Sequence, residues 1–359
     1  MNTADASELW CRLKALDLIT GDAPPVGAIT APWFVRVMLG VAGWIGAVFL
    51  LLFVGLALRA VIDSPGASFV VGLIACTTAG VLFRAKPDSD FAAQFALAVS
   101  LSGQALVLFA LAREMNTNLG VIALSMSVFQ AVLFFTIQNS VHRVWSAWTG
   151  GTAVVFALTD WHLHAYAPGP LAAACAWVWL NEFRYAKSGT MLRAGGYGLV
   201  LTLMGAAGMA AVTSGAALWD SGVQRVVTDS AYHVWFGAGL SGIVLLWTVH
   251  RLLVREAVLP GTGARWRTLA AAGILAVASL KAPGLAPATL ILLLGYANGN
   301  RVLVGLGVVA LLSYLSFYYY SLEVTLLHKS ALMAATGVAL LAVRLLLQKW
   351  WPPMPPQEG

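Results

Sequence analysis

Long runs of apolar residues recur along this chain, separated by short polar connections. A run of about 20 apolar residues crosses the hydrocarbon core of a bilayer as a helix. Twelve runs approach this character, so the pattern predicts an all-α fold: a polytopic transmembrane helical bundle of about twelve spans. The predicted spans are Val37–Leu58, Ala67–Phe83, Phe91–Ala112, Leu119–Ile137, Val144–Thr159, Pro168–Leu180, Ala194–Val212, Ala231–Leu253, Thr268–Leu280, Leu285–Ala297, Val302–Tyr320 and Ser330–Leu347.

The basic residues lie mainly on every second connection between these runs. Sixteen of the 21 Lys and Arg residues fall on the side that carries the N-terminus. Lys and Arg in short loops stay on the cytoplasmic side of a membrane, so we expect both termini to be cytoplasmic. The five basic residues on the opposite side are Arg59, Arg113, Arg225, Lys281 and Lys329.

Composition agrees with a membrane protein. The chain is 60% hydrophobic and only 10% charged, which excludes an ordinary soluble globular protein. Its pI of about 9.4 reflects the topology signal, so we expect the lipid bilayer as a partner and no nucleic acid. The connections are too short for a catalytic domain outside the membrane. Three cysteines in different environments do not suggest a disulfide framework.

The sequence divides into three parts. Residues 1–32 form a cytoplasmic amphipathic N-terminal segment, in which Leu9, Leu13 and Leu16 recur at helical spacing. Residues 33–351 form the transmembrane helical bundle, and residues 352–359 form a cytoplasmic tail. No cleavable signal peptide is recognisable before the first apolar run.

The ninth and tenth apolar runs are unusually short. Thr268–Leu280 would form a helix of about 20 Å, against a hydrocarbon core of about 30 Å. Residues 281–284 (Lys-Ala-Pro-Gly) then interrupt the chain. Two thin spans joined by an outer turn, or one re-entrant hairpin, both explain this pattern. Transporters place substrate sites at short, Pro- and Gly-interrupted helices, and a re-entrant Lys281 would suit an anionic substrate.

Glycines within the spans recur at close spacing, as in Gly205 and Gly208, Gly237 to Gly242, and Gly305 and Gly307. Small residues let helix backbones approach closely in lipid. These positions therefore predict faces where helices pack against one another, with a gating hinge as the alternative.

Polar groups inside a membrane are costly and are therefore candidates for function. Gln104 lies in the third span with Ser100 one turn earlier, where it would contact substrate or form an interhelical hydrogen bond. Three adjacent tyrosines, Glu323 and Lys329 surround the last outer turn, where they would wall a polar vestibule. The full set of candidate substrate contacts is Lys281, Gln104, Tyr318, Tyr319, Tyr320, Glu323, Lys329, Asn300 and Arg301.

We expect no cofactor, no metal and no catalytic residue. Residues 160–164 (Asp-Trp-His-Leu-His) resemble a fragment of a metal site. A single His-x-His pair at an interface is usually solvated, however, and the chain has no phosphate-binding loop.

Three stretches resemble one family. The first is residues 32–44, beginning Pro-Trp-Phe-Val-Arg; the second is residues 98–104, followed by His142-Arg143. The third, and most specific, runs from Ala282-Pro283-Gly284 through residues 299–301 (Gly-Asn-Arg) and 318–322 (Tyr-Tyr-Tyr-Ser-Leu) to Lys329-Ser330. Together they resemble the bacterial integral-membrane family catalogued as domain of unknown function 4401, over nearly the whole chain.

That resemblance implies a multi-pass protein of the bacterial cytoplasmic (inner) membrane, related to domain of unknown function 2157. Members are usually encoded beside a membrane protein named for its GDYXXLXY motif, so a companion of that type is an expected partner. The family name carries no activity, and no functional residue is transferred from it.

Three hypotheses about function follow. The first is permease-like transport of a small or lipid-like anionic substrate, with its site in residues 268–297. The second is a membrane scaffold or assembly partner of the GDYXXLXY-type protein. The third, which the missing extramembrane domain disfavours, is an enzyme that acts on a lipid-linked substrate.

Overall fold

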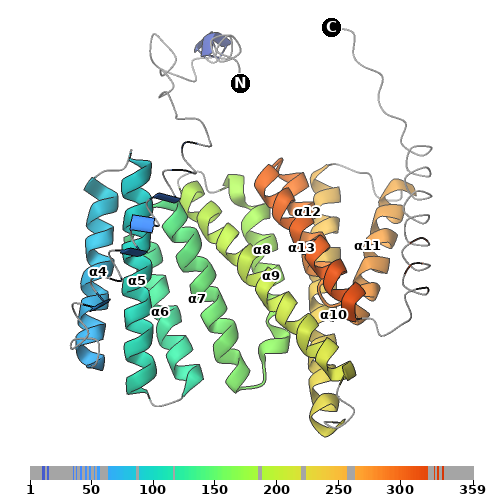
Figure 1. Ribbon diagram of the computed structural model, residues 1–359. Coiled ribbons are helices and arrows are strands. Elements are labelled where there is room, and N and C mark those ends of the chain that lie inside the picture. The colour runs from blue at the N-terminus through green and yellow to red at the C-terminus, as the bar shows by residue number, and fades with distance from the viewer. Residues whose placement is uncertain are drawn as a thin grey trace. The chain divides into compact units, whose positions relative to one another are not determined.

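The computed structural model describes residues 64–85, 89–115, 118–184, 188–219, 224–256 and 263–321, with scattered helical positions before residue 57 and after residue 326. Throughout these residues the secondary structure is helical, and the described connections are short (Figure 1). The chain divides into two compact units, Met1–Val107 and Leu108–Gly359. The first and last predicted spans lie largely outside the described residues.

Ten of the predicted spans fall on ten described α-helices, numbered α4 to α13, several of which extend beyond the predicted bounds. Two 3₁₀ helices, η1 (His164–Tyr166) and η2 (Glu182–Arg184), flank α8. The α-helices are α4 (Pro65–Ala85), α5 (Asp90–Glu114), α6 (Leu119–Thr136), α7 (Ser140–Asp160), α8 (Pro168–Leu180), α9 (Gly189–Trp219), α10 (Gln224–Arg255), α11 (Gly263–Lys281), α12 (Leu285–Ala297) and α13 (Arg301–Ser321).

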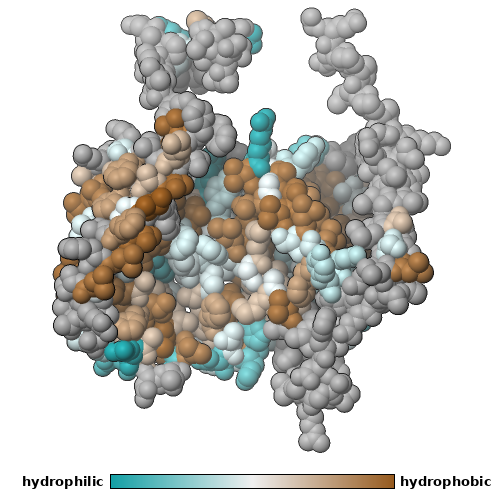
Figure 2. All heavy atoms as spheres, in the orientation of Figure 1, coloured by the Kyte–Doolittle hydropathy of each residue, from teal (hydrophilic) through white to brown (hydrophobic). Residues whose placement is uncertain are grey.

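Six described helices are long and apolar enough to cross a membrane. They give a multi-span helical membrane protein in contact with the lipid bilayer; crossings by the other helices, and the orientation, stay predictions. On the face drawn in Figure 2, hydrophobic residues predominate among those coloured, and the most strongly hydrophilic ones lie at its upper and lower edges. The six candidate segments are Pro65–Ala85, Phe91–Glu114, Leu119–Thr136, Gly189–Val212, Trp235–Arg255 and Arg301–Tyr320.

In the first unit, α4 and the first part of α5 pack through glycine. A Cβ atom added to Gly72 would lie 2.7 Å from the Gly103 carbonyl oxygen, and one added to Gly103 would lie 2.6 Å from the Gly72 oxygen. Such close contact requires residues without side chains, because any larger residue would separate the two backbones.

In the second unit the helices form a row in which each contacts the next, in the order α6, α7, α9, α8, α10 and α11 (Figure 1). The hairpin of α12 and α13 packs on this row, with α12 against α8, α9, α10 and α11. The two shortest α-helices supply much of its interior. Leu290, Ile291 and Leu294 of α12 and Trp179 of α8 are fully buried.

The short helices α8 and α12 are therefore surrounded by other helices of the protein. Each has 13 residues, or about 20 Å of helix, which is less than the hydrocarbon core requires. Helices of this length are tolerated at membrane depth where other helices cover them. In contrast, α11 begins at Gly263, before the predicted start at Thr268, and has 19 residues.

The turn between α12 and α13 has a defined stop and start. Gly299 adopts a positive φ of 62°, and the Asn300 amide donates to the Gly295 carbonyl at 2.9 Å, which ends α12 in a Schellman arrangement. Asn300 then caps α13, because its Oδ1 accepts a hydrogen bond from the Leu303 amide at 3.2 Å.

Candidate functional site

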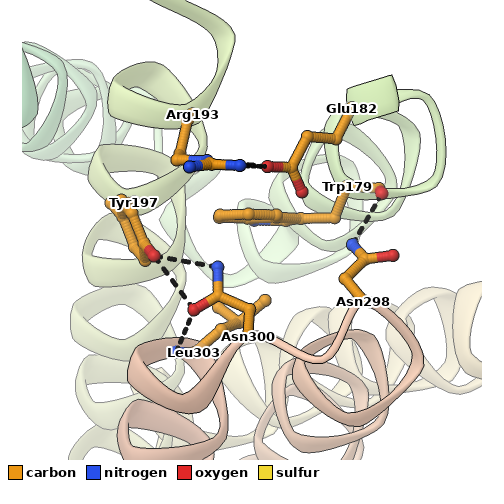
Figure 3. A network of polar contacts seen from close by, with 7 residues as sticks. All are labelled: Trp179, Glu182, Arg193, Tyr197, Asn298, Asn300 and Leu303. Atoms are coloured by element: carbon orange, nitrogen blue, oxygen red, sulfur yellow. Dashed lines mark hydrogen bonds and ion pairs between the residues drawn. The ribbon is translucent and has the colours of Figure 1, made fainter. Parts of the chain in front are cut away.

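Polar side chains from α8, η2, α9 and the α12–α13 turn meet at one end of the second unit. We call this group the polar cluster (Figure 3). The Trp179 ring extends between the Glu182–Arg193 pair on one side and the asparagines of the turn on the other. The cluster consists of Trp179, Glu182, Arg193, Tyr197, Asn298 and Asn300.

Tyr197 and Asn300 join α9 to the start of α13. The Tyr197 hydroxyl donates to Asn300 Oδ1 at 3.0 Å and accepts from Asn300 Nδ2 at 2.8 Å. The residues are 103 positions apart in sequence, and both are partly buried. One asparagine thus caps its own helix and holds a neighbouring helix.

Asn298 and Trp179 make a second connection across the cluster. Asn298 Nδ2 donates to the Trp179 carbonyl at 2.8 Å, and the Trp179 ring meets the Tyr197 ring edge-on with centroids 5.1 Å apart. Trp179 Nε1 and Asn298 Oδ1 are buried, and neither has a hydrogen-bond partner among the described residues. The hydrogen-bonding capacity of the cluster is therefore not fully used. Each unpaired buried donor or acceptor costs about 1–3 kcal/mol.

The third connection is an ion pair within the polar cluster. Arg193 Nε and Nη2 each lie 2.7 Å from Glu182 Oε1. The Glu182 side chain is 5% exposed, whereas that of Arg193 is 56% exposed. A carboxylate this buried depends on its partner, because the loss of one charge leaves the other uncompensated.

A cavity of about 270 Å³ lies between α9, α12 and α13. Its wall is mainly aliphatic, with a hydroxyl from Ser313 and another from Tyr314. The Tyr314 ring covers Gly284, because a Cβ atom added to Gly284 would overlap it. The lining residues are Met204, Ala207, Gly208, Ala211 and Val212 of α9, Gly284, Pro287, Ala288 and Ile291 at the start of α12, and Ala310, Ser313, Tyr314 and Phe317 of α13.

Lys281 ends α11 on the exposed surface. Its ammonium lies 5.2 Å from the centroid of the Trp235 ring of α10, within cation–π range. Lys281 is not one of the described residues that line the cavity.

Gln104 belongs to the packing of the first unit. It is 5% exposed, and its Nε2 donates to the Ser100 hydroxyl at 3.1 Å within α5. Cys76 of α4 lies against the same turn, with Sγ 3.5 Å from the Ser100 carbonyl oxygen. The hydrogen bond described for Gln104 lies within α5. The interhelical hydrogen bond and the substrate contact both stay predictions.

The candidates from the end of the chain divide between two places. Asn300 enters the polar cluster, with exposed Arg301 beside it. Tyr318 stacks on the cavity residue Tyr314 with centroids 6.4 Å apart, while Tyr319 and Tyr320 meet edge-on. Glu323 and Lys329 lie outside the described residues.

The three tyrosines point in different directions, as helical geometry requires. Tyr319 is partly buried, Tyr318 is 40% exposed and Tyr320 is 75% exposed. The proximity of Tyr318 to the cavity wall is compatible with the predicted vestibule, whose other members remain undescribed.

Most of the polar cluster was not predicted. Trp179 and Tyr197 are isolated aromatic residues in sequence, and nothing in the apolar pattern links them to Asn298. One signal was available: Glu182 is an acidic residue on a connection that otherwise carries Arg184, Lys187 and Arg193. An acid among cations on a short loop indicates local pairing.

The His-x-His stretch has a structural role in part. Asp160 Oδ2 accepts from the Gly120 amide at the start of α6, and so joins the ends of the α6–α7 hairpin. The described residues contain no group of three His, Cys, Asp or Glu side chains that could hold a metal ion.

Comparison with curated proteins finds no match. Comparison with solved structures finds none either. A family model described as "Domain of unknown function (DUF4401)" matches residues 32–350, nearly the whole chain. The chain therefore belongs to the DUF4401 family.

Proposed function

We propose that this protein is a permease that moves a lipid-like anionic molecule through its bundle. The observation that carries the proposal is the cavity between α9, α12 and α13, which lies within a multi-span membrane protein. Ligand sites in helical membrane proteins form between helices, and they favour short interrupted helices such as α12.

The chemistry of the lining selects the substrate class. The aliphatic wall suits a hydrocarbon chain and offers few partners to a sugar or a small ion. Gly284 and Pro287 put the beginning of α12 at the cavity. The N-terminus of a helix carries partial positive charge and favours an anionic group, and Lys281 lies four residues before α12 begins.

The proposal includes the topology of the chain. Twelve crossings with both ends in the cytoplasm of a bacterial cell would place the α12 start and the tyrosines near the outer surface. Glu323 and Lys329 would then join Tyr318, Tyr319 and Tyr320 in an outer vestibule above the cavity. A phosphatase that is active only outside the cytoplasm should be inactive when fused after Gly359; strong activity there contradicts this topology.

The transport test uses purified protein in lipid vesicles. The probe is phosphatidylglycerol with a fluorescent group on one acyl chain, and an impermeant quencher reports its movement between leaflets. We expect faster movement than in protein-free vesicles, and slower movement for the zwitterionic phosphatidylcholine probe. Equal rates with and without protein would contradict the proposal.

Two glycines of α9 provide matched variants. A Cβ atom added to Gly205 or to Gly208 meets no described atom within 4 Å, but only Gly208 lines the cavity. Gly208→Leu should fill the cavity and slow movement of the probe several-fold, whereas Gly205→Leu should leave it unchanged. Equal rates for the two variants would show that the cavity does not carry the lipid.

The GDYXXLXY-type companion stays a predicted partner. If the vesicles show no lipid movement while the two proteins co-purify from native membranes, the scaffold hypothesis replaces the permease.

A further inference from the structure

The polar cluster and the cavity both involve α9 and the hairpin of α12 and α13, at different depths along these helices. On α9 the cluster residue Tyr197 precedes the cavity residue Met204 by about 10 Å of helix, and on α12 Ile291 precedes Asn298 by the same distance. The polar cluster therefore lies toward one end of the bundle, and the cavity lies deeper.

A layer of packed apolar side chains separates the two. Leu203 of α9, Leu294 of α12 and Leu303 of α13 are each fully buried in one hydrophobic core. Their positions fall within about two helical turns of the cluster residues on the same helices. A substrate leaving the cavity toward the cluster would meet first this apolar layer and then the polar bonds.

The hairpin of α12 and α13 is itself closely packed. A Cβ atom added to Gly295 would lie 2.6 Å from the Val304 amide nitrogen, and one added to Gly307 would lie 2.7 Å from the Leu292 backbone. Backbones this close favour movement of the two helices as one body. The contact of α9 with α12 and with α13 is much less extensive than the contact of α12 with α13, so the hairpin is held to α9 less tightly than to itself.

Two pairs of hydrogen-bonded residues connect this hairpin to its surroundings across the cluster. Tyr197 holds Asn300 from α9, and the Trp179 carbonyl holds Asn298 from the end of α8. Both asparagines belong to the turn that joins the hairpin's helices. Trp179 Nε1 and Asn298 Oδ1 lack partners among the described residues, so part of the polar capacity at this turn is unused in this conformation.

We propose that the polar cluster is a closed gate, and that release of the α12–α13 turn from Tyr197 and Trp179 opens the cavity toward this end of the bundle. The inference rests on the proposed function in that the cavity is taken as the substrate site. The gate lies at the end of the bundle that the charge pattern predicts to be cytoplasmic.

The test measures access to the cavity, without any lipid substrate. The native thiols are replaced (Cys11→Ser, Cys76→Ala, Cys175→Ala), and a reporter is introduced by Ala310→Cys in the cavity wall. A membrane-impermeant maleimide is added to vesicles of either orientation, and the rate of labelling is recorded for each side.

Tyr197→Phe is the principal variant because it removes both hydrogen bonds to Asn300 and keeps the ring against Trp179. We expect labelling from the cluster side to rise several-fold. Tyr296→Phe is the matched control, since Tyr296 lies on α12 near the same turn and its side chain is exposed. No increase for Tyr197→Phe, or an equal increase for Tyr296→Phe, would overturn the gate.

A second pair covers the case in which Tyr197→Phe does not fold. Asn298→Ala removes a hydrogen bond to the Trp179 carbonyl from a different helix hairpin. Asn181→Ala removes a hydrogen bond of the same length to the Trp177 carbonyl, at the C-terminal end of the same helix, α8. Only Asn298→Ala should raise labelling; equal effects would overturn the proposal. If labelling rises but no lipid probe moves in vesicles, the gate stands and the proposed substrate is wrong.

Discussion

Glu182 and Arg193 form an ion pair in which one partner is buried and the other is half exposed. The carboxylate oxygen Oε1 accepts from Arg193 Nε and Nη2, both at 2.7 Å. The pair joins η2 to the beginning of α9 across a connection that is otherwise basic. Because only Glu182 is buried, we expect mutation of the two residues to lower the stability of the protein by different amounts.

Arg193→Ala should destabilise the protein by about 1–3 kcal/mol, because it leaves the buried Glu182 carboxylate without its donors. Glu182→Gln should cost less, since the amide oxygen still accepts and Arg193 reaches water. The midpoint of thermal aggregation in detergent, measured by size-exclusion chromatography, gives the order. Arg184→Ala, an exposed cation of the same connection, is the control; a midpoint for Arg193→Ala equal to that of the control would contradict the expectation.

Gly284 and Tyr314 lie directly against each other in the cavity wall. Gly284→Ala should destabilise the protein by about 1–3 kcal/mol, because the added methyl group overlaps the Tyr314 ring. Gly273→Ala in α11 is the control, since its added Cβ meets no described atom within 4 Å. Thermal midpoints in detergent distinguish them.

The coupling between these two residues supplies a second test. In the background of Tyr314→Leu, the flexible side chain should yield space to the methyl group, so Gly284→Ala should cost less than in the native chain. Strict additivity of the two changes would mean that the ring is not what the methyl group meets.

Gly237 and Gly239 lie two residues apart on α10 but have different surroundings. A Cβ atom added to Gly237 would overlap the Ala165 carbonyl oxygen of η1, whereas one added to Gly239 would make ordinary contact with Leu280 at 3.6 Å. Gly237→Ala should therefore lower the yield of folded, monodisperse protein, and Gly239→Ala should not. Equal yields would show that α10 and η1 do not pack as described.

This packing determines which glycines can be mutated in a test for binding of a companion protein. Gly237 and Gly242 contact Ala165 and Ala276 within the chain, so enlarging them would damage the bundle itself. A loss of co-purification with a companion protein after such a change would report misfolding. Exposed positions, such as Gly205, are the appropriate ones for that experiment.

The apolar pattern predicted the helices well because burial in lipid imposes the same requirement on every residue of a span. The helices expected at Leu285–Ala297 and Pro168–Leu180 have those bounds in the structure. The start of α11 was predicted too late, because Arg265 and Arg267 interrupt the apolar run but not the helix. Helix formation depends on backbone hydrogen bonds, which exposed charges near a terminus do not disturb.

The pairing of helices was harder to predict, because it depends on contacts distant in sequence. Gly307 proved to be a contact position, against Leu292, and Gly305 meets no described atom within 4 Å. The two glycines have the same local pattern and differ only in which side of α13 they occupy. The polar cluster was missed for the same reason, since Tyr197 and Asn300 meet only after α9 and the α12–α13 turn have packed.

Lys281 and Arg251 provide the last test, because both place a cation over a tryptophan of α10. Lys281 Nζ lies 5.2 Å from the Trp235 centroid, and Arg251 Cζ lies 5.4 Å from the Trp247 centroid. The two pairs lie toward opposite ends of α10, and only Lys281 adjoins the start of α12. Loss of either cation–π pair should cost about 0.5–1 kcal/mol, so stability alone will not separate them.

Transport should separate them. If Lys281 attracts the anionic group of the substrate, Lys281→Ala should slow the movement of phosphatidylglycerol several-fold and leave that of phosphatidylcholine nearly unchanged. Lys281→Arg keeps the positive charge and should move both lipids at the native rates. The difference between the two lipids should shrink as salt is raised from about 0.01 M to 1 M, since screening shortens the reach of an exposed charge from about 30 Å to 3 Å. Arg251→Ala should not discriminate between the lipids. If Lys281→Ala slows both lipids equally, Lys281 supports the fold at the end of α11 and does not select charge.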